Sequence, residues 1–373
     1  MTEPSGPSEP SEPSSPRLDE ADEVREEERF DLEKIRPFLA TAFPGATGEI
    51  TARQFRKGHS NLTYLVRIGD HEAVLRRAPF GARVKTAHDM AREWNLLTAL
   101  QGVYARAPRP LAFCDDESVL GARFYLMQRV QGVILRGDGS GSGLSLTPEL
   151  LRATSTALVD NLAELHAVDL VKTGLGSMGK PAGYVERQVR GWTERYLAAK
   201  TDEVPEIEAA AAWAARNMPE GSGAALVHND YKYDNVVLDP ADPTRVVAVL
   251  DWEMATIGDP LMDLGTTLGY WTDPSDSPLL KAHAFGPTHL PGSLSRQEVV
   301  ARYAERSGRA VDHALFHYVF ALVKLAVILQ QIYRRYVDGH TRDPRFAPLI
   351  QLVRVLGTQT ARALDRGRIH DLG

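Results

Sequence analysis

The chain has 373 residues, of which 43% are hydrophobic and 25% charged, a composition typical of a soluble globular protein. This length is sufficient for two domains with cores of their own. The single cysteine, Cys114, excludes an internal disulfide and favours a reducing compartment, so we expect a cytoplasmic protein.

The acidic charge is concentrated at the N-terminus. Residues 1–29 hold ten acids and three arginines, a net charge of −7, so the rest of the chain carries +1 of the total of −6. A nearly neutral body gives no support to a nucleic-acid partner, which requires a basic face. Residues 1–16 are mainly Ser, Pro, Glu and Gly, and the stretch lacks the apolar segment of a signal peptide. We therefore expect residues 1–29 to be a disordered acidic tail; the alternative for the charge-rich residues 18–29 is an extension of the first helix.

The following hundred residues predict a small sheet with one main helix. An apolar pattern that starts at Phe30 predicts a first helix, which stops near Pro44-Gly45. Strands are expected at 50–55, 63–68, 72–76, 110–114 and 122–129, and the main helix at 86–101. A five-stranded antiparallel sheet with one helix has the element order of the N-lobe of a protein kinase.

The chain beyond residue 147 is predicted to be mostly helical. Helices are expected at 148–166, 183–199, 204–217, 297–306, 311–337 and 345–366. The apolar run 314–329 raises the alternative of a membrane span, but His317 and Lys324 interrupt it and it is short for a span. We expect a buried helix and no membrane, in an α+β protein with a small sheet-containing lobe and a larger helical lobe.

The segment from His228 to Asn235 carries the strongest functional signal. Asp230 and Asn235 bracket four residues, as in the catalytic loop H-R-D-x-x-x-x-N of protein kinases, and Asp251 follows sixteen residues after Asn235. In phosphoryl transfer from a nucleotide, Asp230 can take the proton of an attacking hydroxyl and Lys232 can neutralise the moving phosphate. Asn235 and Asp251 can hold Mg²⁺ against the other phosphates of ATP.

Short apolar strands frame this motif. Residues 224–227 precede the loop, residues 235–238 follow it, and 245–250 form a buried strand that runs into Asp251 after a turn at Pro240 and Pro243. A hairpin of the last two strands is expected to bring Asp251 close to Asn235. The alternative is a solvated loop with ordinary capping aspartates.

With these motifs, and with the stretch Leu250-Asp-Trp-Glu-Met-Ala-Thr-Ile-Gly-Asp-Pro-Leu-Met-Asp-Leu-Gly265, the chain resembles the aminoglycoside phosphotransferase family, which has a protein-kinase-like fold. It is most similar to a subgroup that includes the kinase-like domain fused to some acyl-CoA dehydrogenases. The resemblance implies an N-lobe at 30–129 and a C-lobe at 130–373. It also implies that Asp230 is the catalytic base, that Asn235 and Asp251 bind the metal, and that Asp263 hydrogen-bonds the catalytic-loop backbone.

Residues of the predicted N-lobe are candidates for nucleotide binding. The loop 57–64 lies where kinases cover the phosphates, and it suggests that Ser60 and Asn61 contact phosphate, although an ordinary hairpin turn explains it equally well. Arg76 stands where protein kinases have lysine, and Glu93 is its expected ion-pair partner. Strand alternation sends Arg77 to the other face.

The end of the last predicted N-lobe strand resembles the family's hinge. There Met127 would flank adenine, and the Gln128 carbonyl and the Val130 amide would form the two hydrogen bonds to the base. These are mainly backbone contacts, so the identity of the side chains is weak support.

The sequence leaves the acceptor open. An ATP- and Mg²⁺-dependent kinase that acts on a hydroxyl of a small molecule is the leading hypothesis, and a nucleotide-binding regulatory module without turnover is the alternative. The acceptor is either aminoglycoside-like or an anionic metabolite such as a hydroxyacyl-CoA, whose phosphates the pair Arg334-Arg335 can meet. Glu253 either reaches a second metal or is solvated.

Overall fold

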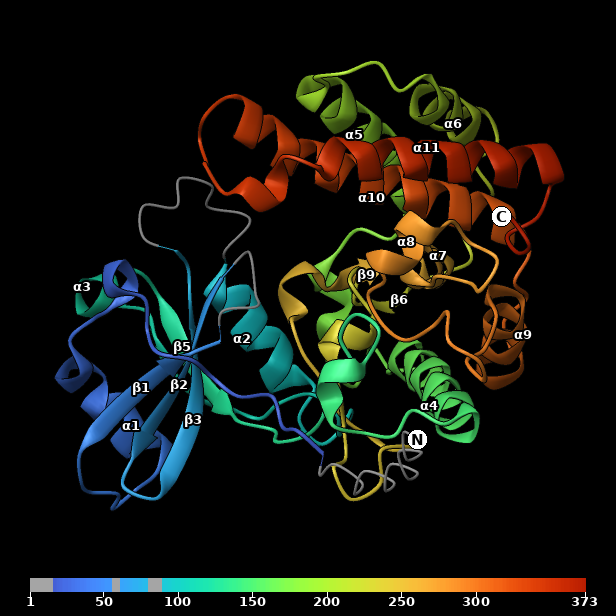
Figure 1. The fold of residues 1–373 in the computed structure, drawn as a ribbon. Helices are drawn as coiled ribbons and strands as arrows, with labels where there is room; N and C mark the ends of the chain where they lie inside the picture. Colours follow the sequence, from blue (N-terminus) through green and yellow to red (C-terminus); the bar gives the residue numbers. More distant parts are fainter. Residues whose placement is uncertain (1–15, 56–60, 80–88) are drawn as a thin grey trace, which may run out of the picture.

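The computed structural model describes residues 16–55, 61–79 and 89–373. One lobe, called the N-lobe here, is built on a five-stranded antiparallel sheet with the order β1-β2-β3-β5-β4 (Figure 1). The strands are β1 Ile50–Gln54, β2 Leu62–Ile68, β3 His71–Arg77, β4 Pro110–Cys114 and β5 Phe124–Gln128. The remaining part, called the C-lobe, is mostly helical. The predicted α+β architecture, with a small sheet-containing lobe and a larger helical lobe, is confirmed.

Alternation along the strands gives the N-lobe sheet two covered faces. One face packs against α1 (Arg36–Ala42), where Leu39 and Tyr64 are fully buried. The other face packs against α2 (Met90–Ala99), which begins after Asp89, whose side chain accepts from the Arg92 N–H at 3.1 Å. A short helix, α3 (Glu117–Leu120), leads into β5.

Residues 16–29 differ from the expected disordered tail. They contact both lobes. Asp22 exchanges two backbone hydrogen bonds of 2.8 Å with Gln54 on β1, and the Arg17 N–H donates to the Ser142 carbonyl at 2.7 Å. Ala21 is buried, and Asp19 forms an ion pair of 2.7 Å with Arg136. The apolar residues that follow this acidic stretch continue into the N-lobe core: Phe30 packs edge-on against Tyr64. Charge density alone predicted disorder and took no account of these contacts.

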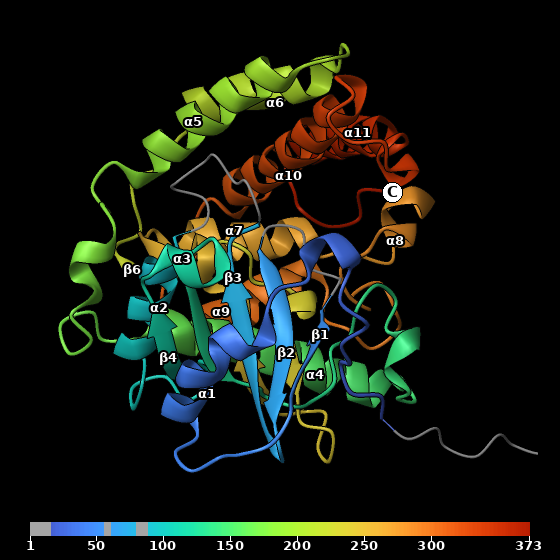
Figure 2. The same ribbon diagram turned by 90° about the vertical axis from the view of Figure 1, so that its left-hand side faces the viewer.

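Eight helices form the C-lobe. They are α4 Pro148–His166, α5 Tyr184–Ala199, α6 Pro205–Arg216, α7 Pro260–Tyr270, α8 Pro278–Ala282, α9 Arg296–Ser307, α10 Ala314–Val337 and α11 Leu349–Arg366. Figure 2, in which the N-lobe faces the viewer, shows α5, α6, α10 and α11 gathered on one side of the molecule. The helices α7 and α8 had no counterpart in the sequence prediction.

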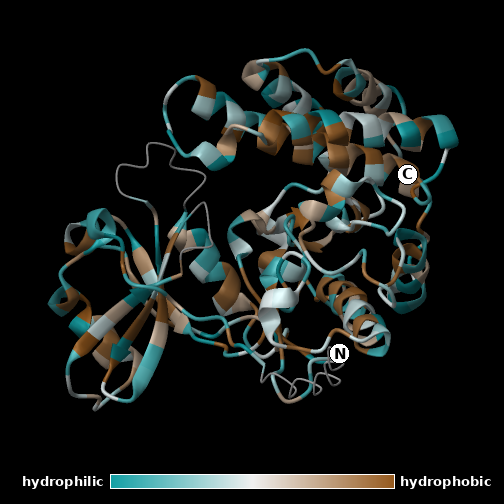
Figure 3. Ribbon diagram, viewed as in Figure 1, coloured by the Kyte–Doolittle hydropathy of each residue, from teal (hydrophilic) through white to brown (hydrophobic). Residues whose placement is uncertain are grey.

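The apolar helix α10 is the central packing element of the C-lobe. It contacts α5, α6, α7 and α11, and Figure 3 shows long hydrophobic stretches along it. Its length and composition would suffice to cross a membrane, but 78% of its most apolar window is buried inside the protein. Gly265 lets α7 approach α10 closely, because a Cβ there would lie 2.7 Å from the carbonyl oxygen of His317.

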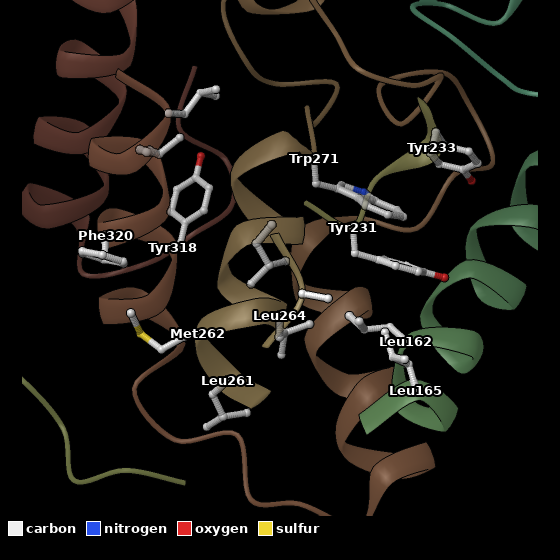
Figure 4. Packing of buried hydrophobic residues seen from close by; sticks show 14 of the residues in the cluster. Leu162, Leu165, Tyr231, Tyr233, Leu261, Met262, Leu264, Trp271, Tyr318 and Phe320 are labelled. Atoms are coloured by element: carbon white, nitrogen blue, oxygen red, sulfur yellow. The ribbon is translucent and has the colours of Figure 1, made fainter. Parts of the chain in front are cut away.

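Side chains from three helices meet in this core. Figure 4 shows them: Leu162 and Leu165 from α4, Leu261 and Leu264 from α7, and Tyr318 and Phe320 from α10. Burying each such large side chain contributes about 1.5–3 kcal/mol. The core therefore fixes α7, which in turn supports the catalytic loop.

Two short antiparallel pairs carry the predicted motif. Strands β7 (Val236–Leu238) and β8 (Val246–Val249) form the expected hairpin. Strand β6 (Ala225–Val227) pairs with β9 (Thr256–Gly258), a three-residue strand that the sequence prediction missed. The N–H of Leu250 donates to the Asn235 carbonyl at 2.8 Å, so the segments that carry Asn235 and Asp251 lie side by side, as predicted.

Candidate active site

The catalytic loop is held by one buried carboxylate. Asp263, on the first turn of α7, is completely buried and accepts from the backbone N–H groups of His228 at 2.6 Å and Asn229 at 2.7 Å. The role implied for Asp263 by the family resemblance is thus observed. Asn229 adopts a left-handed backbone conformation with φ of 66°, which Asn tolerates better than most residues.

His228 connects this loop to the strand that precedes Asp251. The Asp230 N–H donates to its Nδ1 at 3.3 Å, so Nε2 carries the proton and donates to the Leu250 carbonyl at 2.9 Å. The imidazole is fully buried, and burial lowers its pKa. His228 therefore braces the loop as a neutral group.

The side chains of Asp230, Lys232 and Asn235 converge. Lys232 Nζ lies 2.6 Å from both carboxylate oxygens of Asp230, and Asn235 Nδ2 donates to Asp230 Oδ2 at 2.8 Å. Tyr270, at the end of α7, donates its hydroxyl to Asp230 Oδ1 at 2.7 Å. The motif did not indicate Tyr270, because it lies forty residues further along the chain.

Arg76 is at the centre of an ion-pair cluster that joins the two lobes. Its guanidinium lies 3.2 Å from Glu93 on α2, 2.5 Å from Asp251 and 2.9 Å from Glu253. Both the inward orientation of Arg76 and its pairing with Glu93 agree with the sequence analysis. Arg77 on the opposite face is also buried, and its Nε donates to the Ala78 carbonyl.

The charges of this cluster control its protonation. Burial raises the pKa of Asp251, but the adjacent Arg76 guanidinium more than offsets this, so the net pKa lies below its ordinary value. Burial raises the pKa of Glu93, and Arg76 offsets only part of that rise. The carboxylate of Glu253 is only 14% exposed and accepts from Asn61 Nδ2 at 2.6 Å, so it is not a solvated side chain.

The donor set beside Asp230 fits a hard divalent cation. Asn235 uses Nδ2 as a donor, which leaves its amide oxygen available as a ligand, and Asp251 supplies a carboxylate at the end of the neighbouring strand. Mg²⁺ is commonly held by one or two such oxygens together with substrate phosphates. The described residues contain no cluster of three or more His, Cys, Asp or Glu side chains that would form an all-protein metal site.

A cavity of about 800 Å³ extends between the lobes across this site. At one end it is lined by the predicted hinge residues Met127, Gln128 and Val130. Further apolar residues line the same end and give it walls suited to a planar base: Val74, Ile134, Val237 and Leu250. The hydrogen bonds predicted from the Gln128 carbonyl and the Val130 amide to adenine stay a prediction.

The phosphate-covering loop is only partly described. Ser60 lies outside the described residues. Asn61 is buried and its side chain is bonded to Glu253, so a contact between its backbone N–H and phosphate stays a prediction.

The opposite end of the cavity combines apolar and cationic groups. The apolar lining comes from one face of α10, from the segment before α11 and from the first residue of α11: Leu325, Ile328, Leu329, Ile332, Phe346 and Leu349. The cations are Lys324, Arg335 and Arg345, of which Arg345 pairs with Asp343 at 2.6 Å. The sequence analysis had proposed Arg334 together with Arg335, but Arg334 is not among the residues that line the cavity, and it pairs with Asp338 at 2.8 Å.

Lys324 is a site residue that the sequence analysis noted only as an interruption of an apolar run. It is buried, and its Nζ donates to the Asn229 carbonyl of the catalytic loop at 2.9 Å. Burial lowers its pKa to about 8. A charge within an otherwise apolar helix was the signal available in the sequence.

Comparison with known proteins identifies a family and several relatives by sequence. Residues 51–298 match the model of the phosphotransferase enzyme family. The chain is 32% identical over 349 residues to human acyl-CoA dehydrogenase family member 11, covering 91% of this chain and 44% of that protein. It is 25% identical over 300 residues to viomycin phosphotransferase of Streptomyces vinaceus, covering 74% and 94% of the two chains. The chain thus spans less than half of the first of these relatives.

Solved structures confirm the predicted kinase-like fold. A crystal structure from Ralstonia eutropha JMP134, provisionally named an aminoglycoside phosphotransferase, superposes with a TM-score of 0.73 at 28% identity and covers 88% of this chain and 96% of that one. Choline kinase from Cryptosporidium parvum superposes with a TM-score of 0.59 at 13% identity and covers 92% and 98%. The second likeness concerns the fold alone.

Proposed function

Since the chain belongs to the phosphotransferase enzyme family, we propose that it transfers the γ-phosphoryl group of ATP to a hydroxyl group of a small molecule, with Mg²⁺ as the metal. The observation that carries this proposal is the convergence of Asp230, Lys232, Asn235 and Asp251 at one wall of the interlobe cavity. Such a reaction depends mainly on position and charge, which these side chains supply.

Each residue has a defined task in this reaction. As the acceptor oxygen forms its bond to the γ-phosphorus, Asp230 takes the hydroxyl proton, and the bond from phosphorus to the bridging oxygen of ADP breaks. Lys232, held beside Asp230, offsets charge on the transferred group, and Arg76 is the cation for the other phosphates. Asn235 and Asp251 would hold Mg²⁺, which would neutralise phosphate charge.

The acceptor end of the cavity favours an anionic molecule with an apolar part. Lys324, Arg335 and Arg345 contribute positive charge beside the apolar face of α10. Asp273 and Asp276 surround the buried guanidinium of Arg296, so these two acids are not available to a polycation such as an aminoglycoside. A hydroxylated acyl chain on an anionic carrier such as coenzyme A suits this end better than an aminoglycoside does.

A panel assay tests the proposal. The purified protein is incubated with ATP and Mg²⁺ and with hydroxyacyl-CoA thioesters of different chain lengths, free hydroxy acids, choline and kanamycin, and ADP formation and phosphorylated product are measured. We expect turnover with the hydroxyacyl-CoA class and a loss of about 10²–10⁴-fold in kcat for Asp230→Asn, since that is the usual contribution of a general base.

One variant serves as a control, and two results would contradict the proposal. The variant Asp338→Asn changes a surface carboxylate that pairs with Arg334, and it should retain full turnover. Turnover of kanamycin but of no acyl thioester would refute the acceptor class. Nucleotide binding without phosphorylation of any acceptor, unchanged by Asp230→Asn, would favour the regulatory module instead.

A further inference from the structure

The carboxylate of Asp230 has a complete set of hydrogen-bond donors in this structure. Oδ1 accepts from Lys232 Nζ at 2.6 Å and from the Tyr270 hydroxyl at 2.7 Å. Oδ2 accepts from Lys232 Nζ at 2.6 Å and from Asn235 Nδ2 at 2.8 Å. A carboxylate offers about four lone-pair positions, so another hydroxyl can donate to Asp230 only if one of these bonds is broken.

Tyr270 differs from the other two donors in its origin. Lys232 and Asn235 belong to the catalytic loop and have tasks toward phosphate and metal in the proposed function, whereas Tyr270 ends α7 and lines the cavity. Burial raises the pKa of the Tyr270 hydroxyl well above its ordinary value, so it remains protonated and donates.

The ring of Tyr270 is held on two sides. It packs edge-on against Phe285 with 4.8 Å between ring centroids, and Lys232 Nζ lies 4.6 Å from its centroid. Phe285 also lines the cavity. These contacts keep the phenol hydroxyl directed at the carboxylate oxygen.

We propose that the Tyr270 hydroxyl occupies the position on Asp230 that an acceptor hydroxyl takes in the reaction, and that it thereby prevents Asp230 from activating water. This inference rests on the proposed function. An acceptor bound along α10 makes further contacts there, and their binding energy can offset the loss of the hydrogen bond between Tyr270 and Asp230. A water molecule makes no such contacts and therefore cannot displace the phenol. Tyr270 is then a specificity-determining residue that favours transfer over hydrolysis.

The reaction that Tyr270 suppresses is the hydrolysis of ATP. In that reaction the oxygen of water forms a bond to the γ-phosphorus, its proton passes to Asp230, and the bond to the bridging oxygen of ADP breaks, which releases ADP and phosphate. The variant Tyr270→Phe removes the hydroxyl and keeps the ring that packs against Phe285 and Lys232.

The test measures phosphate release from ATP and Mg²⁺ with water as the only acceptor. We expect Tyr270→Phe to hydrolyse ATP about tenfold faster than the wild type, a change equivalent to about 1.4 kcal/mol in the barrier. Tyr318→Phe is the matched control, because its buried hydroxyl accepts from Gln359 Nε2 at 3.2 Å, away from Asp230, and its rate should equal that of the wild type. A loss of structure alone would lower the rate, so an increase separates this role from a structural one.

A second variant keeps the inference testable if Tyr270→Phe folds poorly. Phe285→Ala leaves the hydroxyl in place and removes the ring that holds Tyr270, so we expect a smaller increase in hydrolysis. Calorimetric titration with a non-hydrolysable ATP analogue gives nucleotide binding in each variant. Unchanged or slower hydrolysis with normal nucleotide binding would overturn the inference and leave the proposed function intact, whereas absence of nucleotide binding in the wild type would overturn both.

Discussion

Replacing Asp263 by Asn tests how the catalytic loop is held. The carboxylate accepts two backbone N–H groups, those of His228 and Asn229, and also lies 3.1 Å from Nε2 of His166. Asparagine has the same shape but only one acceptor oxygen, so it can keep at most one of the two backbone bonds. The NH₂ of the asparagine side chain would lie opposite one of these two backbone N–H groups. Two donors cannot bond each other, so that backbone N–H would be left without an acceptor.

The expected cost follows from these bonds. A hydrogen bond to a charged group contributes about 1.5–3 kcal/mol, and a buried N–H left unpaired costs about 1–3 kcal/mol more. We therefore expect Asp263→Asn to lower the free energy of unfolding by about 3–5 kcal/mol and Tm by about 4–6 °C. Because the loop carries Asp230, kcat should fall while the affinity for nucleotide changes little.

The pH dependence of the free energy of unfolding gives a further check on the role of Asp263. Burial raises the pKa of Asp263, but the hydrogen bond and charge of His166 and the contacts with His228 lower it further, so the net pKa lies below its ordinary value. The stability from this carboxylate is therefore present above about pH 4, its unfolded pKa, and is lost as pH falls through the lower folded pKa.

Thermal unfolding followed by circular dichroism between pH 3 and 8 measures these effects. Asp338→Asn serves as the surface control, since Asp338 is 35% exposed and an exposed ion pair contributes at most about 1 kcal/mol. A Tm for Asp263→Asn within about 2 °C of the wild type, with normal kcat, would refute the claim that this carboxylate positions the loop.

Three further predictions concern the charged groups of the cavity. Arg76→Ala should weaken ATP binding and destabilise the protein by about 3–5 kcal/mol, because it leaves Glu93 buried without its cation. Arg76→Lys should lie between the wild type and Arg76→Ala in both calorimetric affinity for ATP and Tm. If Arg76→Lys and Arg76→Ala had equal effects, loss of the charge would not be the cause. Arg345→Glu should raise KM for an anionic acceptor about tenfold and leave KM for ATP unchanged, and a change in the ATP value alone would place Arg345 outside the acceptor site. KM for the anionic acceptor should also rise as pH increases through about 8, where Lys324 loses its proton, and Lys324→Met should abolish this rise in an initial-rate pH series.

The sequence predicted those parts of the fold that depend on local patterns. Alternation and turn residues indicated the five N-lobe strands, and the fixed spacing of Asp230, Asn235 and Asp251 indicated a site that the hairpin of β7 and β8 then brings together. Alternation within a strand and spacing within a motif extend over only a few residues, so a short stretch of sequence is enough to recognise them.

Other features depend on contacts between distant segments. Residues 16–29 look disordered by composition, yet backbone pairing with Gln54 gives them a partner that no property of the tail itself reveals. The acceptor end of the cavity also depends on segments that are distant in the sequence. Lys324 and Phe346 line it together only because α10 and the segment before α11 border the same cavity. A single sequence has no pattern that reports these pairings.

Helix α7 explains why the catalytic loop needs support that its own motif does not contain. Asp263, Thr267 and Tyr270 are spaced so that one helix face presents all three toward the loop. Asp263 holds the loop's first N–H groups, Thr267 Oγ1 donates to the Tyr231 carbonyl at 3.0 Å, and Tyr270 donates to the Asp230 side chain. Since Gly265 lets the same helix pack closely on α10, the geometry of the base depends on the C-lobe core, and a Gly265→Ala substitution should alter catalysis through packing alone.

The cluster around Arg76 couples the other side of the site to the N-lobe. Asn61 and Arg76 from the sheet and Glu93 from α2 join Asp251 and Glu253, which are C-lobe residues. One guanidinium thus forms ion pairs with three carboxylates, and the phosphates of ATP would compete for it. Asp251 is also a proposed ligand of Mg²⁺, so bound nucleotide and metal would both take partners from this ion-pair cluster. Arg76 would therefore link the binding of nucleotide to the contacts between the two lobes.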